Sequence, residues 1–166
     1  MPRQSLLHLK IMIVDNNPLD LLLLQDMLSE EGYSQLKSLT DAALSVEMYR
    51  AFNPDLLIFG LNNSAPITDA PTADASTAEA SAAEKRANAL PWLEQLRAQV
   101  EETDYRPILA LLEASDRKLK RQVLEGGATD FLVKPLDHTD AVLRVGNLLR
   151  ARLFHLARQQ LVATEN

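Results

Sequence analysis

The chain has 166 residues, of which 46% are hydrophobic and 24% are charged, with a formal net charge of −6 and no cysteine. This length suits one globular domain with an appendage, and the lack of cysteine excludes disulfides and thiolate metal sites. The negative charge disfavours a nucleic-acid surface, and no apolar run reaches the ~18 residues that a membrane span needs. We therefore expect a soluble, cytoplasmic protein without nucleic-acid or membrane partners.

Short apolar runs alternate with helical patterns along the chain. The first run, 10–14, ends in a polar cluster in which Asn17 is the expected helix cap and Pro18 the first helical residue. The helix is expected to end near Gly32. Its apolar positions at helical spacing are Leu19, Leu22, Leu23, Met27 and Leu28.

Four further strands are expected at 36–39, 56–59, 108–112 and 131–133. The helical patterns between and after them run from 40 or 41 to 52, 90 to 100, 116 to 124 and 140 to 161. Strands separated by helices of this length indicate crossover connections. The prediction is a doubly wound α/β domain with five parallel strands and helices on both faces.

Residues 62–88 interrupt this alternation of strands and helices with a low-complexity stretch, mostly of Ala, Ser, Thr, Pro and Asp. Its single large aliphatic residue, Ile67, cannot supply a core, and loops in such units are usually about 2–6 residues long. We interpret the stretch as a tolerated insertion. The alternative is a lid or docking segment, because sites in open α/β sheets form at this edge.

The stretches IMIVDNNPLDLLLLQDMLSEEGY, NPDLLIFGLNN, RPILALLEASD and LEGGATDFLVKPLD resemble response-regulator receiver domains of the CheY-like kind. These are the phospho-accepting modules of bacterial two-component signalling. The resemblance covers about 9–149 and implies the strand order 2-1-3-4-5. It also implies a receiver-like domain at 1–149, with the insertion at about 62–88, followed by a helical extension or linker at 150–166.

The resemblance also identifies a degenerate phosphorylation pocket. Receivers use an acidic pair to hold Mg²⁺, an aspartate as nucleophile, a Thr or Ser, and a lysine that balances the phosphoryl charge. Asp15 and Lys134 match this set, whereas Asn16, Gly60 and Leu112 replace the second acid, the acceptor and the hydroxyl. No catalytic residue is therefore expected. Asp15 remains a candidate metal ligand, although a structural role is favoured for it.

Other pocket positions follow from the same comparison. We expect Lys134 to pair with Asp15, because an unpaired buried ammonium is costly. Leu112 is expected to reach towards the space left at Gly60, and Phe131 occupies the family's aromatic switch position. The family often has a cis bond after the lysine, here at Pro135.

The extension beyond residue 149 resembles the signalling helix that joins receivers to cyclic-dinucleotide domains. It is equally compatible with a dimer seam or a solvated tail. Leu149, Leu153 and Leu156 are the candidate interaction surface. The family also implies a homodimer through the fourth helix, fifth strand and fifth helix.

The functional hypothesis is a non-enzymatic, phosphorylation-independent module without a cofactor. Its partner is another protein or its own C-terminal output domain. One alternative is the N-terminal regulatory domain of a longer enzyme that makes or hydrolyses cyclic di-GMP, and another is weak non-standard phosphorylation. A catalytic flavodoxin-like protein is disfavoured, because the turn after the first strand lacks a glycine-rich phosphate loop.

Overall fold

A five-stranded parallel sheet forms the centre of the computed structural model, which describes residues 3–60, 91–113 and 117–165. The strand order is β2-β1-β3-β4-β5, as predicted. The strands are β1 (Ile11–Val14), β2 (Leu36–Leu39), β3 (Leu56–Gly60), β4 (Ile108–Glu113) and β5 (Asp130–Lys134). Every neighbouring pair is parallel, so the connections are crossovers and the doubly wound α/β fold is confirmed.

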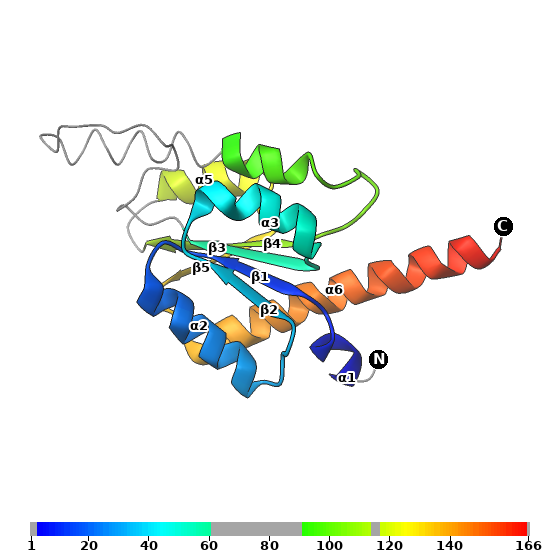
Figure 1. Cartoon of the computed structure of the whole chain (residues 1–166), viewed down its shortest axis with the longest axis horizontal. Helices are drawn as coiled ribbons and strands as arrows, with labels where there is room; N and C mark the ends of the chain where they lie inside the picture. The colour runs from blue at the N-terminus through cyan, green and yellow to red at the C-terminus, as the bar shows by residue number, and fades with distance from the viewer. Residues whose placement is uncertain (1–2, 61–90, 114–116, 166) are drawn as a thin grey trace, which may run out of the picture.

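Helices cover both faces of this sheet (Figure 1). One face carries α1 (Arg3–Leu7), α2 (Pro18–Glu30) and α6 (His138–Thr164). The other carries the 3₁₀ turn η1 (Ala42–Leu44), α3 (Ser45–Phe52), the helical residues 91–97 and α5 (Arg117–Glu125). Helix α1 was not predicted; it contributes Leu6 to the core beside α6.

The start of α2 matches its predicted cap, but its buried face does not match the prediction. The Asn17 side chain accepts hydrogen bonds from the Leu19 and Asp20 N–H groups, which satisfies two of the free donors at the helix start. Three of the leucines that defined the predicted helical spacing, Leu19, Leu22 and Leu23, are exposed. The buried residues of α2 are instead Leu21, Leu24, Met27 and Leu28.

Two apolar clusters fill the space between the sheet and its helices. The cluster under α1, α2 and α6 contains Ile11, Ile13, Leu24, Leu28, Leu56, Ile58, Leu109, Val145 and Leu149. The cluster on the other face contains Met12, Val14, Tyr49, Leu57, Phe59, Trp92, Leu93, Leu96 and Leu112. Alternate residues of each central strand enter opposite clusters, as expected for a sheet buried on both faces.

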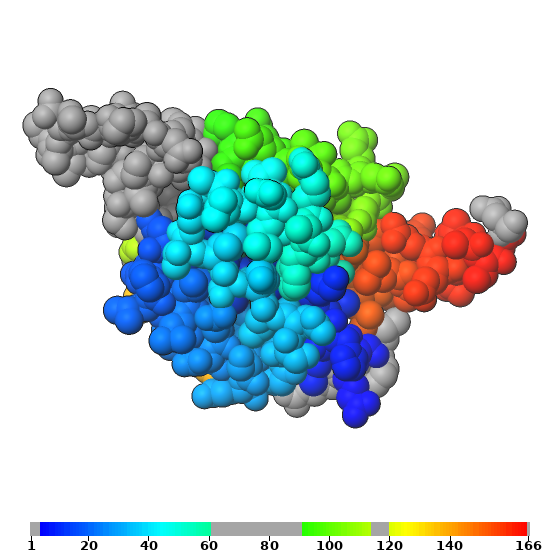
Figure 2. All heavy atoms as spheres, viewed as in Figure 1, coloured from blue at the N-terminus to red at the C-terminus, as the bar shows by residue number. Residues whose placement is uncertain are grey.

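Helix α6 continues without a break past Leu149, the expected end of the domain. Leu149 is fully buried, Arg152 is 3% exposed, and Leu153 and Leu156 pack against the core from partly buried positions. The predicted surface of Leu149, Leu153 and Leu156 is therefore wrong for Leu149, which belongs to the core. Beyond these turns the helix stands clear of the domain body (Figure 2).

The insertion at 62–88 lies outside the described residues. None of the described helices is long and apolar enough to cross a membrane.

Candidate functional site

Asp15, Gly60 and Lys134 meet at the carboxyl ends of β1, β3 and β5. Val14 pairs with Phe59 in the sheet, so Asp15 and Gly60 follow neighbouring strand positions. Lys134 is the last residue of β5 and pairs in register with Glu113 of β4. In open α/β sheets this edge is where ligand sites form. The sequence therefore predicted correctly that these three residues gather at one place.

Lys134 binds two carboxylates at this edge. Its Nζ donates to Asp15 Oδ2 at 2.9 Å and to Asp20 Oδ2 at 2.7 Å. The other Asp15 oxygen, Oδ1, accepts the Asn17 N–H at 2.9 Å. The predicted Lys134–Asp15 pair is confirmed. Sequence reasoning missed Asp20, whose only signal was an acidic residue in the first turn of α2.

The Asp15–Lys134 ion pair is buried. The Asp15 side chain is 0% exposed and that of Lys134 is 7% exposed. Buried charges are tolerated only when they are paired and hydrogen-bonded, since removing them from water is costly. Asp15 meets this condition through the ammonium and a backbone N–H. Lys134 is thereby held by fixed partners of this chain.

The Asp15 carboxylate occupies the space that a side chain at position 60 would need. A Cβ built on Gly60 would lie 2.2 Å from Asp15 Oδ2, 2.6 Å from Cγ and 3.1 Å from Oδ1. Contacts under 3.0 Å are essentially never seen for a real Cβ, so any side chain here requires Asp15 to move. The glycine and the Asp15–Lys134 pair are thus parts of one arrangement.

A second charged cluster lies at the opposite, amino-terminal edge of the sheet. The buried Arg152 guanidinium donates to Asp55 Oδ1 at 3.0 Å, to Asp104 and to the Tyr105 carbonyl at 2.9 Å. Burial alone would raise the pKa of Asp104, but hydrogen bonds from Arg106 and Arg152 outweigh it and lower that pKa. Sequence reasoning missed this cluster, because its members come from three distant segments.

Known proteins with a similar fold provide a comparison for this geometry. No family model matches the chain. The chain is 27% identical over 139 residues to hybrid signal transduction histidine kinase D of Dictyostelium discoideum, a match that covers 84% of this chain and 7% of that kinase. The chain thus spans a small fraction of that relative's length.

Solved structures agree more closely in shape than in sequence. The receiver domain of NtrX from Brucella abortus superposes with a TM-score of 0.62 at 18% identity, covering 85% of this chain and 98% of that one. CheY4 of Vibrio cholerae gives 0.61 at 17% identity, with the same coverage of both chains. The chain has the receiver fold. A protein described as a two-component response regulator/GGDEF domain protein gives 0.67 at 16% identity, covering 90% of this chain and 52% of that protein.

Leu112, Asn16 and Pro135 occupy the other positions that the resemblance assigned to the pocket. Leu112 is 2% exposed and packs in the cluster beneath α3, while the three atoms nearest the space beside Gly60 all belong to Asp15. A carboxylate rather than the expected isobutyl group therefore takes that space. Asn16 is half-buried next to Asp15. The peptide bond between Lys134 and Pro135 is cis, as the resemblance implied.

Phe131, in β5, has cations placed over its ring. Lys120 Nζ is 4.1 Å and the Arg144 guanidinium carbon 5.8 Å from the ring centroid. Arg144 in turn binds Asp130 and Asp140. Cation–π contacts of this kind favour one position of the ring. Its role as a switch remains a prediction.

Metal binding receives no direct support from the described side chains. Among residues 3–60, 91–113 and 117–165, no group of three or more His, Asp or Glu residues is arranged to hold a metal ion. Asp15, the candidate ligand, places one oxygen on Lys134 and the other on the Asn17 N–H. A cation at Asp15 would have to compete with the Lys134 ammonium.

Proposed function

We propose that this chain is a receiver-like signalling module that acts through protein contacts without being phosphorylated. One observation carries the proposal: the Asp15 carboxylate lies where the Cβ of a phospho-acceptor would start at position 60. Phosphoryl transfer to a receiver needs a carboxylate nucleophile at this position and a cation to balance the phosphoryl oxygens. Here the nucleophile is missing and Lys134 already binds two carboxylates.

The proposed module is not an enzyme, and its conformational state is set by something other than a phosphoryl group. A two-state protein shifts only when a ligand or modification binds one state better than the other. In the proposed role, a protein partner or an attached output domain supplies that difference. The Asp15–Lys134–Asp20 arrangement fixes the pocket internally.

A second candidate function is that of a regulatory domain within a longer cyclic di-GMP enzyme. The fold is shared with the response regulator/GGDEF domain protein, and α6 runs past the sheet as a continuous helix. Such a helix is suited to transmit movement to a following domain. Cyclic di-GMP synthesis or hydrolysis by the native full-length protein would favour this function.

The direct test is intact mass spectrometry after incubation with acetyl phosphate and Mg²⁺. A receiver that has its acceptor aspartate serves as the positive control, and we expect the wild-type chain to gain no phosphoryl group. A stable gain of one phosphoryl group would refute the proposal. Peptide mapping would then locate the modified residue and establish the non-standard phosphorylation that the sequence left open.

A matched variant tests the chemical reasoning. Gly60→Asp with Leu112→Thr restores the acceptor and the hydroxyl, but Asp15 must swing out before the introduced carboxylate fits. We expect Mg²⁺ binding to return in this variant, measured by isothermal titration calorimetry. Gly60→Asp alone is the control for the hydroxyl. No recovery in the double variant would count against the interpretation of this pocket as a converted phosphorylation site.

A further inference from the structure

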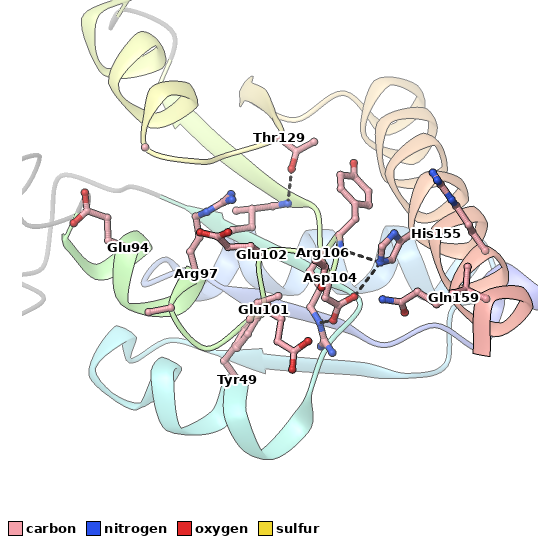
Figure 3. A pocket seen from close by; sticks show the side chains of 18 of the residues that line it. Tyr49, Glu94, Arg97, Glu101, Glu102, Asp104, Arg106, Thr129, His155 and Gln159 are labelled. Atoms are coloured by element: carbon pink, nitrogen blue, oxygen red, sulfur yellow. Dashed lines mark hydrogen bonds and ion pairs between the residues drawn. The ribbon is translucent and has the colours of Figure 1, made fainter. Parts of the chain in front are cut away.

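A cleft of about 1180 Å³ opens at the amino-terminal edge of the sheet, opposite the Asp15–Lys134 site. One wall is the segment after the helical residues 91–97, which includes Val100 and Tyr105. The other wall is the end of α6, from His155 to Ala163. Figure 3 shows the two walls facing each other, with Asp104 and Arg106 between them. Asp15, Gly60 and Lys134 are not among the residues that line this cleft.

The α6 wall is fixed to the domain at its base. Arg152 binds Asp55 and Asp104, and His155 Nε2 accepts the Tyr105 N–H at 3.1 Å. The Tyr105 and His155 rings also contact each other, with centroids 6.2 Å apart. These contacts hold the helix at a set angle to the domain, so the cleft is a built feature of the fold.

The end of α6 exposes large apolar side chains, of which Val162 lines the cleft and Phe154 and Leu161 do not. Phe154 is 69% exposed, Leu161 is 67% exposed and Val162 is 56% exposed. Phe154 and Leu161 are seven residues apart, so they lie on one side of the helix together with Arg150 and Arg158. An apolar stripe of this kind on a projecting helix indicates a contact surface.

The two walls carry opposite charge. Residues 150–164 contain Arg150, Arg152 and Arg158 and no acidic residue. The facing wall has four acids, the exposed Glu94, Glu101 and Glu102 together with Asp104, against two arginines, Arg97 and Arg106, so its net charge is negative. Within the described ranges, neither Arg158 nor any of these three glutamates forms an ion pair. Each chain therefore offers both a basic apolar helix and an acidic cleft.

We propose that the cleft receives the α6 end of a second copy of this chain, with the two helix ends antiparallel. In this arrangement Phe154 and Leu161 of each copy are buried, and Arg158 of one copy faces Glu101 and Glu102 of the other. The contact is repeated by two-fold symmetry, so each favourable pair forms twice. A parallel helix pair would instead bring arginines together without acids, which is unfavourable.

This proposal goes beyond the proposed function by naming one protein contact, and it does not depend on phosphorylation. The acetyl phosphate experiment and the dimer experiment can therefore fail separately. It also differs from the dimer that the family implies. That dimer uses α5, β5 and the start of α6, whereas the cleft lies at the end of α6. Leu143, 57% exposed in the first turns of α6, distinguishes the two surfaces.

The test is sedimentation velocity of the full chain over a wide range of concentrations. We expect a monomer–dimer equilibrium whose Kd rises at least about tenfold in Phe154→Ala and in Arg158→Glu, as for truncation of central interface residues. The charge swap is decisive: Glu101→Arg with Glu102→Arg should also weaken the dimer, and combining it with Arg158→Glu should restore it. All these positions are exposed, so folding, checked by circular dichroism, should be unchanged.

Leu143→Ala is the matched control on the same helix. We expect it to leave the Kd unchanged. A chain that stays monomeric at every concentration would overturn the proposal. So would a dimer that withstands Phe154→Ala and Arg158→Glu but is weakened by Leu143→Ala, because that result places the interface at the start of α6.

Discussion

Replacing Gly60 by alanine tests whether Asp15 really occupies the space beside this residue. The added Cβ would lie 2.2 Å from Asp15 Oδ2, whereas ordinary contacts are 3.4–4 Å. The carboxylate must therefore move by roughly an ångström or more, which breaks its alignment with Lys134 Nζ at 2.9 Å. We expect Gly60→Ala to destabilise the protein, although alanine is ordinarily the better residue in a strand.

The expected magnitude follows from three contributions. Overpacking a buried site costs about 1–3 kcal/mol. Weakening a hydrogen bond to a charged group costs about 1.5–3 kcal/mol. Alanine recovers about 0.5–1 kcal/mol, because glycine loses more conformational freedom on folding. We therefore expect Gly60→Ala to lower the free energy of unfolding by about 3 kcal/mol.

The assay is a double-mutant cycle with Asp15→Ala. The three atoms nearest the new Cβ all belong to Asp15, so its removal should eliminate the clash. In the Asp15→Ala background we expect Gly60→Ala to cost less than about 0.5 kcal/mol. Guanidinium denaturation followed by fluorescence of Trp92 is suitable, because this is the single tryptophan and it is 6% exposed.

Equal costs of Gly60→Ala in both backgrounds would refute the reasoning, since the clash would then involve some group other than Asp15. A stabilising effect in the wild-type background would also refute it. An unchanged m-value across the four proteins is the control, because it shows that the variants differ in stability rather than in the surface exposed on unfolding.

Two further predictions concern the charged clusters. Lys134→Met should cost about 3–5 kcal/mol in guanidinium denaturation, because it leaves the fully buried Asp15 carboxylate without its ammonium partner. Adding Asp15→Asn should recover part of that loss; a double variant as unstable as Lys134→Met would contradict this account. Asp104 has a lowered pKa, so its contribution to stability is present above the ordinary pKa of about 3.9 and is lost as pH falls through the folded value. Asp104→Asn should therefore flatten the fall of Tm with acid, and an unchanged slope would show that other carboxylates cause it.

The local pattern of the sequence was sufficient to predict the doubly wound α/β class, whereas the strand order came from the resemblance to receiver domains. Asn17 and Pro18 define the start of α2, and the continuous apolar runs of β3 and β4 identify strands buried on both faces. These signals are local because capping and strand periodicity depend on residues a few positions apart. The same signals did not determine which face of α2 is buried, because the run Leu21–Leu24 fits several helical registers. Packing against β1 and α6 selected Leu21, Leu24 and Leu28.

The site was predictable in its members but not in its arrangement. The sequence by itself determined that position 60 has no nucleophile and that Asp15 and Lys134 lie at one edge of the sheet. Only the tertiary structure placed the Asp15 carboxylate in the space beside Gly60 and added Asp20 to a lysine 114 positions away. It also buried Arg152 between Asp55 and Asp104, where the sequence indicated a projecting linker. The physical reason is that a side chain's charge partners come from whichever elements pack beside it, and residue spacing along the chain does not specify that packing.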